Sequence, residues 1–121
     1  MAKSVHNSVL DAALNYIKNN CNLMTVCNAE PTTLAQATTT YKLADVAMAS
    51  GDFTVADDTS GRKITAAAKN AIPVDITGDG THVAWCSASE LLLVTTCTTQ
   101  TLTSGNTVDF PAWKYNAQDP T

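Results

Sequence analysis

His82-Val-Ala-Trp-Cys86, followed by Ser87-Ala-Ser-Glu90 and Leu91-Leu-Leu-Val-Thr-Thr-Cys97, is the stretch of this 121-residue sequence that decides its fold. The outer two segments are rich in β-branched, aromatic and aliphatic residues, which favour strands. The polar segment between them is short enough for a tight connection, although it lacks the Asn-Gly type of turn. We therefore predict a β-hairpin here.

Short strand-like segments separated by turn signals continue on both sides of this hairpin. We expect further strands at Leu23–Cys27, Tyr41–Met48, Phe53–Val55, Arg62–Lys69, Asn70–Thr77 and Thr107–Phe110, with turns at Asp57–Gly61 and Asp75–Gly80 and a polar connection at Gln100–Asn106. The segment with Pro73 is expected at a sheet edge or in a bend, because proline has no N–H for hydrogen bonds between strands. Repeated short strands at this spacing favour a mainly β fold, an antiparallel β-sandwich or a small β-barrel.

One amphipathic helix precedes the strands. Its apolar residues recur at three- and four-residue steps, namely Val5, Val9, Leu10, Ala13, Leu14 and Ile17. This periodicity predicts an N-terminal α-helix over about 4–20, with Ser4 as N-cap and Asn19-Asn20 as its end. We expect the apolar stripe to pack on its own domain rather than on a partner.

The composition predicts one domain, 1–121, with a β-rich region at about 23–115 and an irregular tail at 116–121. Of its residues 45% are hydrophobic, but 18 of these are alanine and only 32 are larger aliphatic or aromatic residues. Alanine buries little apolar area, so the core is thin for a very stable monomer. We therefore expect additional burial in a homo-oligomer.

Charge and hydropathy argue against two classes of partner. Seven Lys and Arg residues stand against 11 Asp and Glu residues, without the basic cluster that phosphate binding requires. We expect no direct nucleic-acid binding. The longest large-apolar run is Leu91–Val94, and the N-terminus lacks the apolar stretch of a signal peptide, so we expect a soluble chain made in the cytoplasm, without membrane contact.

The four cysteines are not spaced as metal ligands. Cys21, Cys27, Cys86 and Cys97 lack the short paired spacing of a zinc site. A cytoplasmic origin favours free, buried thiols. A disulfide that forms after release from the cell is the alternative.

Acidic residues and histidines suggest no reaction centre either. Asp75–Gly80 lacks the twelfth-position acid of a calcium loop, and Asp57-Asp58 is expected to be a solvated turn pair. His6 and His82 have no metal ligand at a suitable spacing, and we expect each to lie on the surface or in a hydrogen bond. We expect no enzyme activity, no cofactor and no metal.

Aromatic residues supply the candidate interaction site. Trp85 lies within a predicted strand and is expected in the core. Pro111 interrupts regular pairing between Phe110 and Trp113, so that Trp113 is expected at a rim. Because aromatic residues are enriched at interface hot spots, we assign Phe110, Trp113 and Tyr115 as candidate interface residues.

The whole chain resembles a family of small virion structural proteins of tailed bacteriophages, similar in scale to capsid decoration (cement) proteins. The likeness rests on Ser4–Asn7, Leu10–Asn20, Met48–Phe53, Ser60–Lys63, Leu93–Cys97 and Phe110–Trp113. The resemblance implies a protein of the capsid exterior that binds between major capsid protein subunits as a homo-oligomer, with a trimer favoured. A tail, neck or baseplate component is one alternative, and a glycan-binding host-attachment module of a tail fibre is another.

Overall fold

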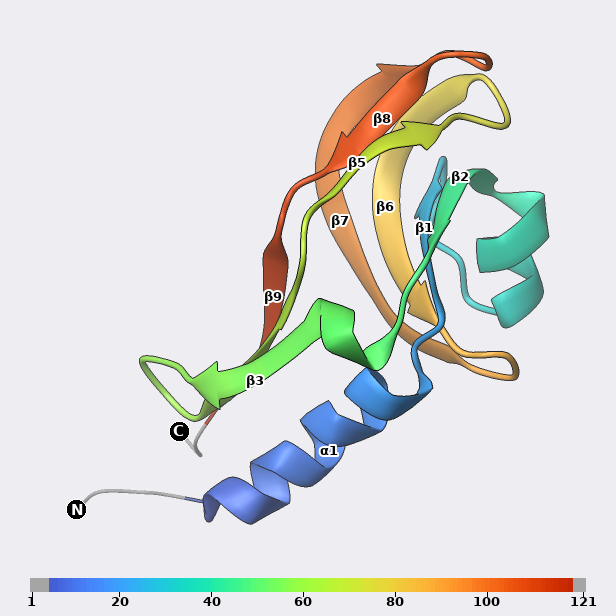
Figure 1. The fold of residues 1–121 in the computed structure, drawn as a ribbon. Helices are drawn as coiled ribbons and strands as arrows, with labels where there is room; N and C mark the ends of the chain where they lie inside the picture. Colours follow the sequence, from blue (N-terminus) through green and yellow to red (C-terminus); the bar gives the residue numbers. More distant parts are fainter. Residues whose placement is uncertain (1–4, 119–121) are drawn as a thin grey trace.

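The structure of the protein is a computed structural model that describes residues 5–118. It consists of one α-helix and nine strands in that part of the chain, with a π-helical segment and a 3₁₀ turn between strands (Figure 1). In chain order these are α1 (Asn7–Asn20), β1 (Leu23–Cys27), η1 (Gln36–Thr40), β2 (Lys42–Ala47), η2 (Ser50–Asp52), β3 (Phe53–Asp57), β4 (Arg62–Ala66), β5 (Lys69–Pro73), β6 (Gly78–Cys86), β7 (Leu91–Leu102), β8 (Thr107–Phe110) and β9 (Trp113–Ala117).

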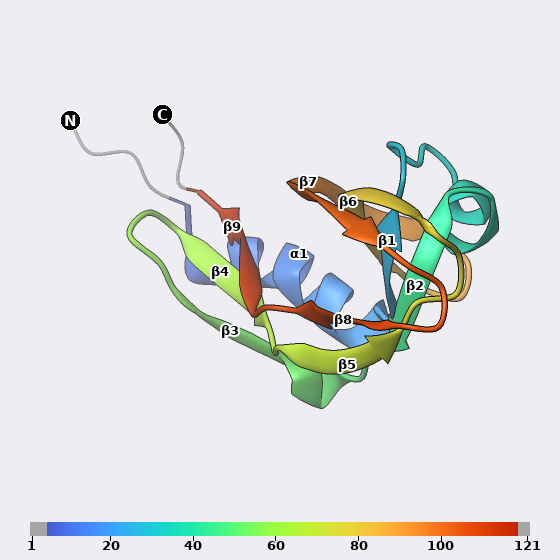
Figure 2. The ribbon, with the colours of Figure 1, turned by 90° about the horizontal axis from the view of Figure 1, so that it is seen from above.

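The strands form three antiparallel sheets, with orders β2-β1-β6-β7, β3-β4-β9 and β5-β8. The predicted mainly β, antiparallel fold with one N-terminal helix is therefore confirmed. The sheets curve around a common interior without closing into a barrel in the described part of the chain (Figure 2).

The hairpin predicted at residues 82–97 is present as β6 and β7. His82 pairs with Thr96 and Trp85 pairs with Leu93. Both strands are longer than predicted, because β6 begins at Gly78 and β7 extends to Leu102. Thus the predicted turn at Asp75–Gly80 and the predicted connection at Gln100–Asn106 are each wrong in part.

Gly80 explains why that turn prediction failed. It is buried in β6, where a Cβ atom would lie 2.9 Å from Val26 Cγ2 of the neighbouring strand. The glycine therefore serves close packing inside a sheet rather than a turn.

The predicted strand at Arg62–Lys69 is divided, with β4 ending at Ala66 and β5 beginning at Lys69. Their partners β9 and β8 are divided in the same way around Pro111-Ala112, so that the two pairs form one long, bent ribbon (Figure 1).

The predicted irregular tail is wrong at its start. Asn116 and Ala117 belong to β9 and pair with Lys63 and Arg62. The Asn116 amide also donates to the backbone oxygens of Ser60 and Arg62 at 2.9 and 3.2 Å. Polar residues form this strand because its partner β4 supplies the pairing. The last three residues of the predicted tail, 119–121, lie outside the described residues.

Helix α1 begins at Asn7, later than predicted, and His6 is its N-cap. The His6 Nδ1 atom accepts a hydrogen bond from the Ser8 N–H at 3.1 Å. Ser4, the predicted N-cap, lies outside the described residues.

The helix packs on its own domain, as predicted, against β3 and β4. Leu14 and Ile17 are buried there, whereas Val9 is 64% exposed. Of the other stripe residues, Val5 and Leu10 are half-buried and Ala13 is exposed, so the predicted stripe is covered only in part.

The two faces of the four-stranded sheet bury different sets of residues. One face contributes Met24, Val26 and Trp85 to the main core. On the other, Ala84 and Cys86 pack against Ala37 of the π-helical segment η1. Both faces of β1 and of the second half of β6 are therefore covered, which explains the nearly continuous apolar sequence of β1 and of Val83–Cys86.

The turn between β3 and β4 depends on Gly61, which has φ +71° and whose added Cβ would lie 2.0 Å from the Ala117 carbonyl oxygen. We expect Gly61→Ala to lower the free energy of unfolding by more than about 1 kcal/mol, measured by urea denaturation, because both the backbone and the neighbouring strand must shift. Gly51→Ala is the matched control, since nothing lies within 4 Å of its added Cβ. Equal stability of the two variants would contradict this account of the turn.

Candidate interaction surface

The predicted interface residue Trp113 contacts the core of its own domain. Its ring stacks on Trp85 with centroids 4.2 Å apart and planes inclined by 29°. Trp85 is fully buried, as predicted, and also meets Phe53 edge-to-face at 5.3 Å. Trp113 remains half-buried. Neither indole N–H donates a hydrogen bond within the described residues, and both are shielded from solvent.

Phe110 and Tyr115 lie in different environments. Phe110 is 4% exposed and belongs to the main core, whereas Tyr115 is 41% exposed. Trp113 and Tyr115 are two residues apart in β9 and so share one face of that strand. The structure thus brings Trp113 and Tyr115 together and places Phe110 inside, and the partner contact assigned to all three stays a prediction.

Tyr115 borders an apolar groove between α1, β9 and the start of β7. The groove has a volume of about 590 Å³ and is lined by Ala13, Tyr16, Ile17, Glu90, Leu91, Leu92, Leu93 and Tyr115. Tyr16 is 49% exposed, and its hydroxyl donates a hydrogen bond to the Glu90 carboxylate across the groove. That hydrogen bond and the negative charge of Glu90 raise the pKa of Tyr16 above its usual value. We call this the α1–β7 groove.

Two parts of the α1–β7 groove were missed by sequence reasoning. Tyr16 fell outside the expected apolar stripe of the helix. The run Leu91–Val94 carried a signal, because a strand without polar alternation has apolar contacts on both faces. All four of its side chains are half-buried.

Ion pairs hold the helix and the β3–β4 turn in place beside the groove. The Arg62 guanidinium lies 2.8 Å from both Asp11 of α1 and Asp57 of β3. Asp58 accepts from Lys114 at 2.7 Å. The expectation of a solvated pair is confirmed for Asp57, whose side chain is 80% exposed, and is wrong for Asp58, whose side chain is 11% exposed beside Lys114.

The cysteines are free thiols in two environments. Cys21, Cys27 and Cys86 are buried, as expected, whereas Cys97 is exposed. Burial, with a further contribution from the neighbouring Cys21 and Cys27, raises the pKa of Cys86 to about 12. These buried thiols are poor nucleophiles at neutral pH, since the thiolate is the reactive form.

The histidines and acidic groups make structural contacts. His82 Nδ1 lies 2.9 Å from the Thr81 hydroxyl, as expected of a hydrogen-bonded histidine. Within residues 5–118, no group of three or more His, Cys, Asp or Glu side chains is arranged to hold a metal ion. Among the same residues, no helix is long and apolar enough to cross a membrane.

Comparison with protein-family models, with curated proteins and with solved structures finds no match to this chain. The class defined by its own structure is a small, mostly antiparallel β protein with one N-terminal helix and an apolar groove beside that helix.

Thiol labelling tests the cysteine environments. We expect a maleimide to modify one thiol per native chain, at Cys97, and four after denaturation, because the other three are buried. Burial also raises the pKa of Cys97, so the native reaction should be slower at pH 7 than that of an ordinary thiol. Mass spectrometry of wild type and Cys97→Ser checks this. Rapid native labelling of Cys97→Ser would contradict it.

Acid unfolding tests the ion pair between Asp52 and Lys69, whose charged atoms lie 2.9 Å apart. The hydrogen bond from Lys69, with one from the Ala49 N–H, lowers the pKa of Asp52 below its usual value. The resulting stabilisation is complete above the unfolded pKa of about 3.9 and is lost as the pH falls through the lower folded pKa.

We therefore expect Asp52→Asn to have a lower free energy of unfolding than wild type at pH 7. Below pH 4 its free energy of unfolding should fall by less than that of wild type, measured by urea denaturation at each pH. Glu30→Gln is the control, since the Glu30 carboxylate makes no hydrogen bond or ion pair within residues 5–118. If Asp52→Asn loses as much stability below pH 4 as wild type does, the ion pair with Lys69 is not the cause of the acid sensitivity.

Proposed function

We propose that this protein is a non-enzymatic structural protein of a tailed-bacteriophage virion, which decorates and stabilises the capsid shell by binding between major capsid protein subunits. In this proposal it acts as a homo-oligomer, a trimer, on the exterior of the capsid. The observation that carries the binding part is the α1–β7 groove.

The groove has the chemistry of a protein-contact surface. Tyr16 and Tyr115 present exposed rings on its two sides, and the half-buried Leu91–Leu93 form an apolar wall. Tyrosine is enriched at interface hot spots because it combines a large apolar ring with a polar hydroxyl. Glu90 is the one charged side chain of the lining, and its carboxylate already accepts from Tyr16. Docking here buries apolar area, and the Tyr16 hydroxyl supplies a hydrogen bond to the one carboxylate that docking removes from water.

The monomer also has a physical reason to dock. The apolar stripe of its helix is covered only in part, and Val9 remains 64% exposed. Burying a Leu- or Val-sized side chain contributes roughly 1.5–3 kcal/mol. Because alanine makes up a large share of the apolar residues, the core of one chain buries few large side chains. Further apolar burial is therefore expected at interfaces with neighbouring subunits.

The capsid as partner rests on the resemblance of the sequence to small virion proteins. Several residues that carry this resemblance make contacts between different elements of the present fold. Asp11 and Arg62, from two of the resembling segments, make an ion pair at 2.8 Å. Phe53 and Trp113, from two others, both contact Trp85. These residues thus have structural roles in this chain, and both a shared fold and a shared role on the capsid belong to the proposal.

The test is binding of the purified protein to capsid shells assembled from the major capsid protein of the phage that encodes this chain. We expect a trimer by native mass measurement and saturable binding in cosedimentation. Cryo-electron microscopy is expected to show density on the shell exterior, between capsid subunits. Tyr115→Ala and Tyr16→Ala should each weaken binding at least about tenfold, because each removes an exposed ring of the groove.

Ile76→Ala is the matched control. Ile76 is as exposed as Tyr16, at 49%, but lies in the connection between β5 and β6, at the far end of the molecule from α1 (Figure 1). We expect this variant to bind as wild type does. Location of the protein in the tail or baseplate, its absence from particles, or glycan binding lost in Trp113→Ala would refute the capsid placement.

A further inference from the structure

The strand order leaves two sheet edges on either side of one gap. The four-stranded sheet runs β2-β1-β6-β7, and β2 continues into the β5 region through a bridge between Ala44 and Val74. The Leu43 carbonyl also accepts from the N–H groups of Asp75 and Ile76 at 2.8 and 3.1 Å. Since β5 pairs with β8, the series starts at β7 and ends at β8.

Neither of these end strands has a second partner. β7 pairs with β6 alone, β8 pairs with β5, and β9, which continues from β8, pairs with β4. Within residues 5–118, no backbone hydrogen bond joins β7 to β8 or to β9. The backbone groups on these two edges are therefore free to pair with an added strand.

The β7 edge lacks charge and proline, two of the devices that protect a sheet edge, although its pairing with β6 is irregular between Thr96 and Gln100. Its twelve residues, Leu91–Leu102, include no charged residue and no proline, and they extend over about 40 Å. Natural edges are usually blocked by lysine, by proline or by a covering element. The opposite edge strand, β2, carries Lys42 and Asp45 and is also bridged to Val74. The uncharged edge is thus the longest strand among residues 5–118.

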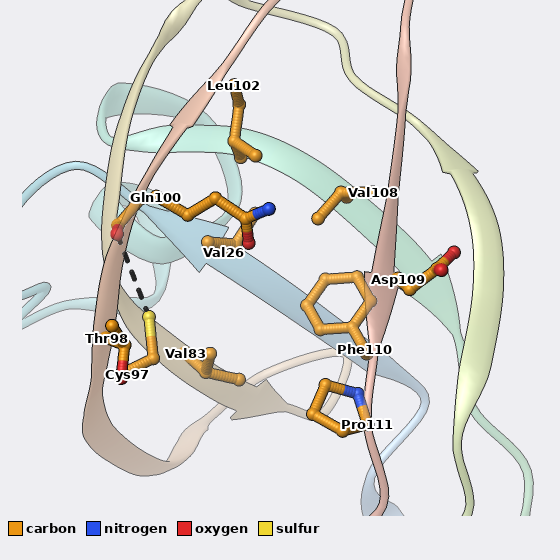
Figure 3. Close-up of a pocket in the computed structure, with 11 residues that line it drawn as sticks. Val26, Val83, Cys97, Thr98, Gln100, Leu102, Val108, Asp109, Phe110 and Pro111 are labelled. Carbon is orange, nitrogen blue, oxygen red and sulfur yellow. Dashed lines mark hydrogen bonds between the residues drawn. The ribbon is translucent and has the colours of Figure 1, made fainter.

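Two adjoining cavities fill the space between β7 and the β8–β9 ribbon. Their volumes are about 230 and 220 Å³, and both are lined by Val83, Cys97, Phe110 and Pro111. We call this space the β7–β8 seam. Figure 3 shows Phe110 and Val83 facing its interior, with the Gln100 amide reaching into it.

The seam carries no charge on its interior. Asp109 is its single acidic lining residue, and its carboxylate turns away to accept from the Ala71 N–H at 2.7 Å (Figure 3). An ionised side chain buried here would lose its hydration without a counter-charge. The lining therefore favours an uncharged occupant with apolar side chains.

We propose that the β7–β8 seam binds one extended polypeptide segment of a partner protein, which adds as a strand between β7 and β8. The segment is uncharged over about five to seven residues and directs alternate apolar side chains towards Val83 and Phe110. Free strand edges require backbone N–H and C=O groups as partners, which only a polypeptide supplies in a row. This inference does not depend on the partner being a capsid protein.

A second copy of the chain fits the seam less well than a single segment. A copy that presented its own β7 edge would bring β6 and the sheet behind it. The β8–β9 ribbon borders the other side of the gap, so an occupant that pairs with both β7 and β8 needs two free edges, which an isolated strand has and the β7 strand of a second copy, already paired with β6, does not. The chemistry of the occupant is therefore that of an arm or a tail that is extended before it binds.

The test uses an acetylated and amidated heptapeptide of alternating threonine and valine as the probe. We expect saturable binding to the wild-type protein, followed by NMR-detected hydrogen exchange. Amides of β7 from Thr95 to Leu102 and of β8 should slow together. The same peptide with N-methyl groups on its three valines should bind at least tenfold more weakly, because it lacks N–H donors on one edge.

Cys97→Trp fills the seam and should weaken binding at least tenfold, since Cys97 lines both cavities. Thr99→Trp is the matched control, because Thr99 is exposed in the same strand and lines neither cavity, and its affinity should stay within twofold. The comparison of the two peptides on wild type does not depend on the folding of either variant.

Three results would overturn the proposal. One is an absence of saturable peptide binding. A second is slowed exchange in β7 alone, which would indicate simple edge addition. The third is concentration-dependent protection of β7 without peptide, which would assign this edge to a second copy of the chain.

Discussion

The contact of Trp85 with Phe53 and Trp113 is the interaction on which the rest of this structure depends. Trp85 belongs to β6 of the four-stranded sheet, whereas Phe53 and Trp113 belong to β3 and β9 of the three-stranded sheet. These two sheets share no direct backbone ladder within the described residues, and side chains join them wherever the backbone bridge through β5 does not reach. In a core diluted by alanine, three large rings supply much of the available apolar area. This contact therefore sets how the two sheets face each other, and with it the position of the groove beside α1.

Local patterns in the sequence predicted the parts of this fold that depend on local physics. The hairpin around Trp85, the helix and the burial of Trp85 follow from residue type and spacing within a few positions. The strand identity of Asn116-Ala117 does not, because these polar residues become a strand through pairing with Arg62 and Lys63, over fifty positions earlier. Gly80 shows the same limit, since the close approach of Val26 that it permits is visible only in three dimensions.

The interaction surface was predictable to the same extent. Trp113 and Tyr115 stood out as aromatic residues near a break in regular pairing. Tyr16 did not, because it becomes a surface feature only when Glu90 and β7 lie beside the helix. Phe110 was assigned to an interface from its neighbours in sequence, yet its ring points into the molecule (Figure 3). The direction of a side chain next to a proline depends on the path of the whole ribbon.

The two surfaces of functional interest share one strand. The first residues of β7, Leu91–Leu93, line the α1–β7 groove, and its later residues, from Thr95 onward, line the β7–β8 seam. The long hairpin with β6 is what holds both surfaces in a fixed relation. A neighbour bound at one surface would therefore lie along the same strand as a neighbour bound at the other.

Arg62 contacts both ends of the described chain. It binds Asp11 in the second turn of α1 and pairs with Ala117 at the end of β9, so that the start of the helix and the last strand lie at the same pole (Figure 1). The first turns of the helix and the end of β9 are consequently held together by one side chain, although they lie at opposite ends of the sequence. The β5–β6 and β7–β8 connections lie at the opposite pole (Figure 1), so loss of the Arg62 ion pair would loosen the two ends of the described chain together and leave that pole in place.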